Sequence, residues 1–311
     1  MTNSRPASNR PFTAVPPAVE SSYVGHGGLS LFRRIWRPAN GIPSRGVLVN
    51  VHGLGDHSGL YPYLVGHAVA SGWTVHAPDL RGNGRSPGQR AYIATWDEFR
   101  DDLHHLLTVV RAEEGDVPLF VMGTSLGGLI VLDYALHHPE GLDGVIAVSP
   151  PVGRLGVPRY MLLLAEVASR VWPRLALKTG MDLSGLARDP AIVHEVLNDP
   201  LFHRVATARL GTELQRIITE LQQNAASFTA PLLLLHGGAD RMVPPDGSRE
   251  FITKAGSADK QYREYPGDYH ALFADYDRDT VLADLEQWMS AHVPAPARHV
   301  APVTAPRGAT W

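Results

Sequence analysis

The stretch Gly123-Thr124-Ser125-Leu126-Gly127 follows an apolar run at residues 119–122 and precedes a helical pattern at residues 129–136. A G-x-S-x-G motif between a strand and a helix is typical of a nucleophile elbow, a sharp turn that holds the serine hydroxyl above the sheet. The two glycines let the strand and helix backbones pass close together. The motif therefore predicts Ser125 as a catalytic nucleophile.

A serine nucleophile needs a histidine base and a carboxylate that orients the base. Asp240 comes shortly after the apolar strand pattern of residues 232–235, and His270 comes shortly after residues 261–265, which are also predicted to form a strand. Both therefore fall at the carboxyl ends of predicted strands, the edge where parallel sheets place their sites. The order Ser125, Asp240, His270 predicts a triad of nucleophile, acid and base.

Three other residues in this part of the chain could be mistaken for members of the triad. Asp246 and Asp268 are rival candidates for the acid. His236 also ends a strand, but it precedes Asp240 in the chain and is interpreted as a packing residue.

Two backbone N–H groups should hold the negative charge that develops on the substrate carbonyl. One belongs to the residue after the serine, Leu126. The other comes from the loop after an earlier strand, which here is His52-Gly53-Leu54-Gly55 after the strand pattern of residues 47–51. We expect Leu54 to provide this second donor, although the loop could also be an ordinary turn.

The sequence predicts no metal site. The pairs His104-His105 and His137-His138 lie on helical patterns, the chain contains no cysteine, and we interpret these histidines as having no carboxylate at metal-ligand spacing.

Strand patterns alternate with helical patterns along the chain, which predicts a mostly parallel sheet covered by helices on both faces. Residues 152–228 interrupt the alternation with several helical patterns and no clear strand, so we expect a helical cap inserted into a core of residues 23–151 and 229–293. The first cap helix carries many apolar residues, among them Leu163 and Leu164. They could simply pack on the core, line an acyl-chain channel, or touch a membrane.

The chain has 311 residues, a formal net charge of −3 and no cysteine. This charge does not favour a nucleic-acid partner, and the lack of cysteine excludes a disulfide framework. The Pro-rich ends, residues 1–22 and 294–311, are expected to be disordered tails. Neither a secretory signal nor a membrane-length apolar run is visible, so we expect a cytoplasmic protein, with peripheral membrane contact through the cap as an open alternative.

From about Tyr23 to about His292, which is nearly everything but the tails, the chain resembles the monoacylglycerol lipase and lysophospholipase group of the α/β-hydrolase superfamily, the serine aminopeptidase S33-like hydrolases. The segments that carry the resemblance are His52–Gly59 with Tyr61, Asp79–Ser86 with Gly88, Arg90 and Phe99, Asn198–Leu201, Gly238–Asp240 and Tyr269-His270. The resemblance implies an α/β-hydrolase fold with a helical cap, a cofactor-free serine hydrolase, and a small lipid ester as substrate.

The chain departs from this group near the expected head-group site. Asp56 stands where a Glu is frequent, and Leu60 and Phe273 replace an Arg and a His that monoacylglycerol lipases commonly carry. Thr124 and Asn83 likewise replace histidines. We expect Gly53, Asp56 and Phe273 to contact the substrate, with Leu163 and Leu164 along its acyl chain.

The predicted activity is hydrolysis of monoacylglycerols through an acyl-enzyme. A lysophospholipase or a broad carboxylesterase is the alternative within the same chemistry, and a non-catalytic ligand-binding α/β-hydrolase is a more distant one. Arg81, Arg85 and Arg90 are the nearest basic residues that could hold a phosphate, but their glycine-rich segment is better explained as a structural turn.

Overall fold

The apolar strand patterns form one sheet, and the computed structural model describes this sheet within residues 15–39, 42–153, 159–180 and 182–293. Its eight strands are β1 (Val19–Val24), β2 (Ser30–Trp36), β3 (Val47–Val51), β4 (Thr74–Pro78), β5 (Leu119–Thr124), β6 (Gly144–Val148), β9 (Leu232–Gly237) and β10 (Lys260–Tyr265). Their spatial order is β1-β2-β4-β3-β5-β6-β9-β10. Only β1 and β2 pair antiparallel with their neighbours, and the pairs from β4 to β10 are parallel.

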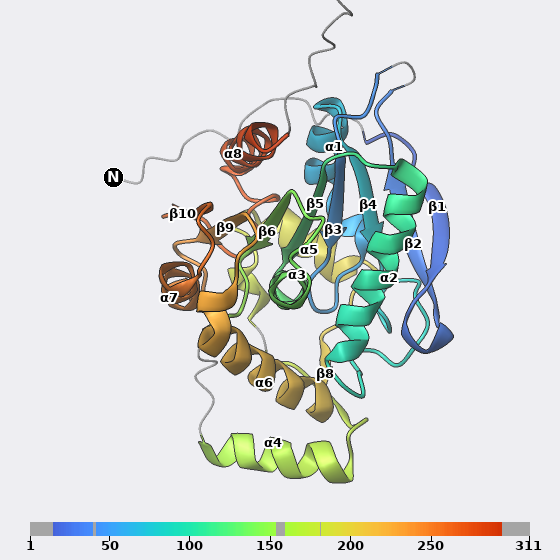
Figure 1. Ribbon diagram of the computed structural model, residues 1–311. Helices are drawn as coiled ribbons and strands as arrows, with labels where there is room; N and C mark the ends of the chain where they lie inside the picture. The colour runs from blue at the N-terminus through green and yellow to red at the C-terminus, as the bar shows by residue number, and fades with distance from the viewer. Residues whose placement is uncertain (1–14, 40–41, 154–158, 181, 294–311) are drawn as a thin grey trace, which may run out of the picture.

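Helices cover both faces of the sheet, as predicted (Figure 1). One face packs against α2 (Asp97–Glu114), α3 (Leu126–His137) and α7 (Asp246–Lys254), and the other against α1 (Pro62–Ala70) and α8 (Arg278–Ala291). The central strands are buried along their whole length because helices lie on both sides. This burial explains why their sequences are continuously apolar rather than alternating.

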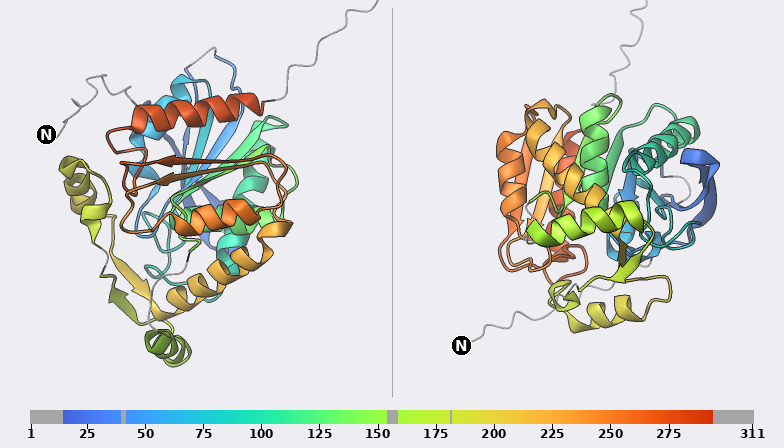
Figure 2. Two further views of the ribbon diagram at one scale, coloured as in Figure 1. Left: turned by 90° about the vertical axis from the view of Figure 1, so that its left-hand side faces the viewer. Right: turned by 90° about the horizontal axis from the view of Figure 1, so that it is seen from below.

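The segment between β6 and β9, called the cap segment from here on, contains α4 (Arg159–Val171), β7 (Ala176–Lys178), η3 (Leu183–Gly185), α5 (Pro190–Asn198), β8 (Val205–Thr207), α6 (Ala208–Asn224) and η4 (Ala225–Ser227). Helix α6 packs against α3, and α4 lies outside α6, farther from the sheet (Figure 2).

The prediction that the cap segment holds no strand was wrong. β7 and β8 form a two-stranded antiparallel sheet of their own. Each is three residues long, which is too short to produce a recognisable period-two pattern in the sequence.

The amino-terminal boundary also differs from the prediction. β1 begins at Val19, so residues 19–22 belong to the sheet rather than to a tail. β1 is an edge strand with mostly exposed side chains, and its polar composition therefore resembles that of a tail. The rest of the two predicted tails, except residues 15–18, lies outside the described residues. The division into core and cap at residues 152 and 228 stays a prediction.

Candidate active site

Ser125 lies at the turn between β5 and α3 in a backbone conformation that side chains rarely adopt, with φ 55° and ψ −117°. The turn is held because the Ser125 N–H donates to Val148 O at 2.8 Å. A Cβ on Gly123 would lie 2.1 Å from Gly127 O, and one on Gly127 would lie 2.1 Å from Val51 O. The motif glycines are therefore required by close backbone approach, as the sequence suggested.

The predicted acid and base are in direct contact. Asp240 and His270 are each 5% exposed, and His270 Nδ1 lies 2.6 Å from Asp240 Oδ2. The other carboxylate oxygen of Asp240 accepts the backbone N–H groups of Met242 and Val243 at 2.8 and 2.9 Å.

These contacts decide the charge of the acid. Burial raises the pKa of Asp240, but hydrogen bonds from His236, His270 and the Val243 backbone outweigh burial, and the net effect lowers it well below its usual value. Asp240 is therefore ionised throughout the neutral range and suited to stabilise an imidazolium.

Neither rival acid occupies this position. The Asp246 side chain is 82% exposed and pairs with Arg249 at 2.6 Å. Asp268 is buried and bonded to Arg188.

His236 does more than pack. Its Nε2 lies 3.5 Å from Asp240 Oδ2 and 2.9 Å from Val243 O, and its Nδ1 lies 2.8 Å from Ser248 Oγ. The ring therefore braces the loop that carries the acid. The sequence signal for this role was its place at the end of β9, immediately before the glycine turn.

Ser125 and His270 line one cavity at the carboxyl edge of the sheet. The apolar part of its lining includes Leu54, Leu60, Ile192, Val196, Leu272 and Phe273. Among the described residues no hydrogen bond joins the Ser125 hydroxyl to the His270 ring. That bond is frequently long in unliganded enzymes and shortens when substrate binds.

The other predicted site residues divide into two groups. Gly53, Leu54, Asp56 and Phe273 line the cavity, and Leu126 follows Ser125 as the first residue of α3. The two α4 residues are not brought together with them. Leu164 is 64% exposed and does not line the cavity, and the Leu163 side chain lies outside the described residues.

The loop that carries Leu54 is held from both sides. On the sheet side, the Gly53 N–H donates to the Tyr61 hydroxyl at 3.2 Å, and that hydroxyl donates to Asp56 Oδ2 at 3.0 Å. On the cap side, the His203 N–H donates to Gly55 O at 3.1 Å. A Cβ on Gly55 would lie 2.0 Å from His203 O, so only glycine allows this contact.

The Asn198–Leu201 motif contributes a further contact to the same loop. Asp199 Oδ2 lies 3.1 Å from His57 Nε2, which joins the cap segment to the loop after β3. The sequence identified this motif by resemblance alone and did not predict what it touches.

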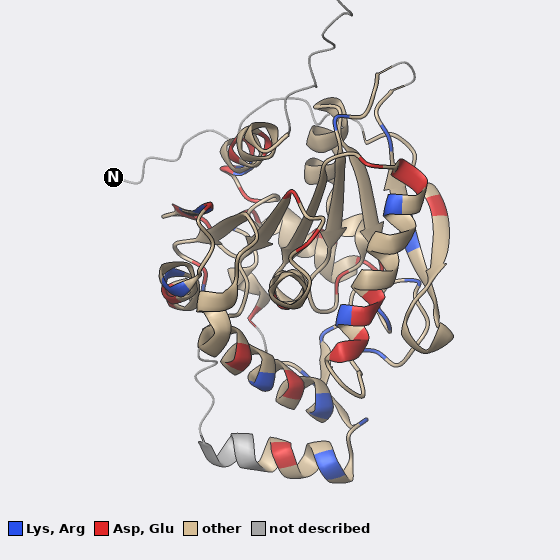
Figure 3. Cartoon of the chain, viewed as in Figure 1, with Lys and Arg blue, Asp and Glu red and all other residues tan. Residues whose placement is uncertain are grey.

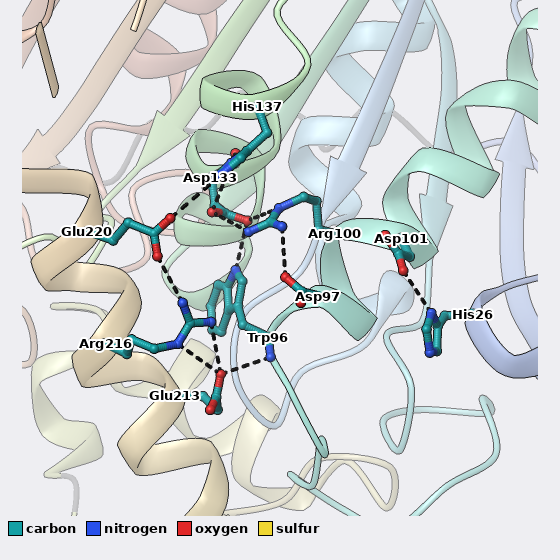
Figure 4. Close-up of polar contacts among 10 residues, drawn as sticks. All are labelled: His26, Trp96, Asp97, Arg100, Asp101, Asp133, His137, Glu213, Arg216 and Glu220. Atoms are coloured by element: carbon teal, nitrogen blue, oxygen red, sulfur yellow. Dashed lines mark hydrogen bonds and ion pairs between the residues drawn. The ribbon is translucent and has the colours of Figure 1, made fainter. Parts of the chain in front are cut away.

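His137, the last residue of α3, has carboxylate neighbours that the sequence did not predict. Ligand-type atoms of Asp133, His137 and Glu220 lie within 4.8 Å of one another (Figure 4). Arg100 donates to both Asp133 oxygens at 2.8 and 3.0 Å, and Trp96 Nε1 donates to one of them at 3.0 Å. These donors already satisfy the carboxylate, so the cluster is better explained as a polar link between α2, α3 and α6.

The second such cluster is His76, Glu113 and Glu114. Arg33 bonds to Glu113 and Arg37 to Glu114, so arginines again compensate the carboxylates.

The family described as "Serine aminopeptidase, S33" matches residues 42–277, which include all three candidate triad residues. The chain belongs to this family. Its predicted membership of the α/β-hydrolases and its predicted fold class are therefore confirmed.

Relatives and solved structures agree with that assignment. A monoacylglycerol lipase of Mycolicibacterium smegmatis is 32% identical over 276 residues, covering 88% of this chain and 98% of the relative. The crystal structure of Paleococcus ferrophilus monoacylglycerol lipase superposes with a TM-score of 0.76 at 34% identity, covering 84% of this chain and 99% of that one. A soluble variant of monoglyceride lipase from Saccharomyces cerevisiae, in complex with a substrate analog, superposes with a TM-score of 0.81 at 26% identity, covering 94% and 100%.

Proposed function

We propose that this family member is a serine hydrolase that cleaves the ester bond of monoacylglycerols and releases a fatty acid and glycerol. The observation that carries the proposal is the buried 2.6 Å contact between Asp240 and His270, beside a largely apolar cavity that Ser125 also lines. The relatives named monoacylglycerol or monoglyceride lipase, which align over most of the chain, support the choice of substrate.

The reaction needs one proton carrier and one anion site. His270 takes the hydroxyl proton of Ser125 as the serine oxygen attacks the ester carbonyl, and Asp240 stabilises the imidazolium that forms. The Leu54 and Leu126 N–H groups hold the tetrahedral oxyanion. His270 then gives its proton to the leaving glycerol oxygen, and water hydrolyses the acyl-enzyme by the same steps in reverse order.

The cavity suits a substrate with a long apolar part and an uncharged polar end. The apolar side chains around Ile192, Val196 and Leu272 can cover an acyl chain, and each buried CH₂ contributes about 0.8 kcal/mol. Near the serine, Asp56 and the Tyr61 hydroxyl provide polar groups for the alcohol.

The charge of the cavity argues against an anionic head group. The described lining contains no lysine or arginine, whereas Asp56 and Glu195 both contribute carboxylates. The phosphodiester of a lysophospholipid would therefore find no lysine or arginine in this lining. Leu60 and Phe273 both line the cavity, and their apolar side chains favour a broad carboxylesterase as the second candidate.

We also propose that α4 brings the enzyme to lipid surfaces. Leu164, Val167, Val171 and Trp172 are each more than half exposed, and Leu177 on the adjoining β7 is 62% exposed. On the coloured part of α4 in Figure 3, the charged side chains are Glu166 and Arg170, which pair with each other at 2.8 Å. No helix among the described residues is both long and apolar enough to cross a membrane.

The proposed activity is tested by measuring kcat/KM for a monoacylglycerol, a lysophosphatidylcholine, a triacylglycerol and a methyl ester that share one acyl chain. The monoacylglycerol should be the best substrate. A lysophospholipid that exceeds it by more than about tenfold, or about 1.4 kcal/mol of transition-state discrimination, would replace the proposal with a lysophospholipase activity. A methyl ester that equals it would support the carboxylesterase.

A further inference from the structure

Arg188 is a cap residue whose guanidinium lies among three carboxylates of the loop that carries His270. It donates to Asp268, its Nη2 lies 2.9 Å from Asp277 Oδ2, and its Nε lies 3.1 Å from Asp275 Oδ1. The side chains of Asp268 and Asp275 are completely buried. Removing Arg188 would leave two buried carboxylates without the cation that compensates them.

Hydrogen bonds of the backbone join the same two segments as these ion pairs. The His270 N–H donates to Gly185 O at 3.3 Å, and the Ala271 N–H donates to Leu186 O at 2.7 Å. In the other direction, the Arg188 N–H donates to Asp275 Oδ1 at 3.2 Å. Cap residues 185–188 therefore run alongside the histidine loop and are bonded to it at several points.

Asp275 ties the two ends of the loop together. Its Oδ2 accepts the Tyr269 N–H at 3.3 Å and its Oδ1 accepts the Tyr276 N–H at 2.8 Å, while Oδ1 also faces Arg188. The position of the Asp275 carboxylate thus determines the path of the backbone on both sides of His270. Arg188 is the cation that holds this carboxylate from the cap side.

We propose that Arg188 is a positioning residue for His270. It fixes the histidine loop against the cap segment and compensates the buried negative charge of Asp268 and Asp275 on that loop. This inference rests on the proposed function, because it assigns His270 the role of general base.

The charged groups near His270 and its loop come from several elements. The groups around His270 and its loop are Asp240 and Arg241 after β9, His236 on β9, Asp268, Tyr269, Asp275 and Asp277 on its own loop, Arg188 in the cap segment, and Asp56 and Glu195 across the cavity. Burial raises the pKa of Asp268 to about 7, Asp277 and Asp275 add to the rise, and Arg188 opposes it. Loss of Arg188 should raise the pKa of Asp268 further, but Asp275 and Asp277 would still lose their cation, so imidazolium should be favoured. Arg241 is exposed, and solvent screens its charge.

The test compares Arg188→Gln and Arg188→Lys with Arg241→Gln as the matched control. Arg241 also joins the cap segment to this region, but it is exposed, donates to Ser184 O at 2.8 Å and lies over the Tyr269 ring. Arg188→Gln should lower kcat about tenfold or more with KM changed less than about threefold. It should also move the acid limb of the pH–rate profile upward by about half a unit.

Arg188→Lys should recover part of both effects because it keeps the charge, and Arg241→Gln should resemble the wild type. Equal profiles for Arg188→Gln and Arg241→Gln would overturn the inference.

Asp275→Asn keeps the size of the side chain and removes a negative charge, so the acid limb of its pH–rate profile should move downward. If Arg188→Gln does not fold, this variant decides, and an upward or absent shift overturns the inference.

The two proposals fail separately. Wild-type protein without esterase activity would contradict the proposed function. The imidazole titration of His270, followed by NMR and assigned with His270→Gln, needs no substrate and should show the same upward shift in Arg188→Gln. An unchanged titration overturns the positioning role even if the wild type is a fully active esterase.

Discussion

His236 Nε2 lies 3.5 Å from the same Asp240 oxygen that His270 Nδ1 contacts at 2.6 Å. The proposed acid is therefore held between two imidazoles, that of the proposed base and one that braces the loop. His236→Ala would leave Asp240 and Ser248 without this ring, and we expect kcat to fall by about tenfold. His236→Gln should retain more activity because its amide can still bond to the loop. Steady-state kinetics on one soluble ester would measure the difference, and a wild-type rate in His236→Ala would refute the bracing role.

Replacing Ser125 by Ala should lower kcat for ester hydrolysis by several orders of magnitude. The far-UV circular dichroism spectrum should stay unchanged. A fluorophosphonate probe should label the wild type and leave Ser125→Ala unlabelled. A variant that keeps a tenth of the wild-type activity would exclude Ser125 as the nucleophile.

Asp240→Asn should be severely impaired, and less so than His270→Ala, because the acid orients the base while the base moves the proton. Asp246→Asn is the matched control, since it makes the same chemical change on an 82% exposed side chain paired with Arg249. Comparison of kcat/KM for the three variants checks the assignment. If Asp246→Asn is the worse of the two acid variants, the acid has been misassigned.

Activity should fall on the acid side of neutrality as His270 takes up a proton, because an imidazolium cannot accept the serine proton. Stability should behave differently. The folded-state pKa of Asp240 is depressed, so its contribution to the free energy of unfolding is present above its unfolded value and lost only as pH falls below about 4. A pH–rate profile and a set of denaturant titrations should thus show activity declining before stability. A rate unchanged from pH 8 to pH 4 would contradict a histidine base.

The exposed apolar side of α4 gives a prediction about interfaces. Val167→Glu and Val171→Glu should weaken binding to phosphatidylcholine vesicles and slow hydrolysis of monoacylglycerol presented in them, because charge opposes insertion of an apolar surface. Hydrolysis of a soluble short-chain ester should be unaffected. Thr108→Glu, an exposed change on α2, is the control. Equal loss on both kinds of substrate would mean that α4 stabilises the fold instead.

The residues at the ends of β5, β9 and β10 could be predicted because their motifs are local in sequence. A strand, a glycine turn and a reactive side chain follow one another within eleven residues, and the parallel topology then brings the three ends to one edge. The alternation of strands and helices could be predicted for a similar reason, since apolar patterns are strong in buried elements.

The contacts between the cap segment and the core could not be predicted in this way. Arg188 meets Asp268, and His203 meets Gly55, across long separations in sequence, with no periodic pattern to connect them. His137 shows the same limit, because its neighbour Glu220 comes from α6 and is adjacent only in three dimensions. Contacts of this kind depend on how the elements pack in three dimensions. In the sequence, the segment around each of the two residues looks like an ordinary solvated surface.

The left-handed backbone of Ser125 has a consequence for engineering. A side chain held at φ 55° and ψ −117° stores strain on the order of 1–3 kcal/mol, which the surrounding packing must overcome in every folded molecule. Glycine adopts this conformation without a steric penalty. Its unfolded chain has more conformational entropy, however, and this cancels about 0.5–1 kcal/mol of the stabilisation. The inactive Ser125→Gly protein should thus melt at a higher temperature than the active enzyme, whereas Ser125→Ala, which keeps its Cβ, should not. A library of variants selected for thermal stability alone would then be enriched in inactive Ser125→Gly protein. Such a library therefore has to be screened for catalytic activity as well.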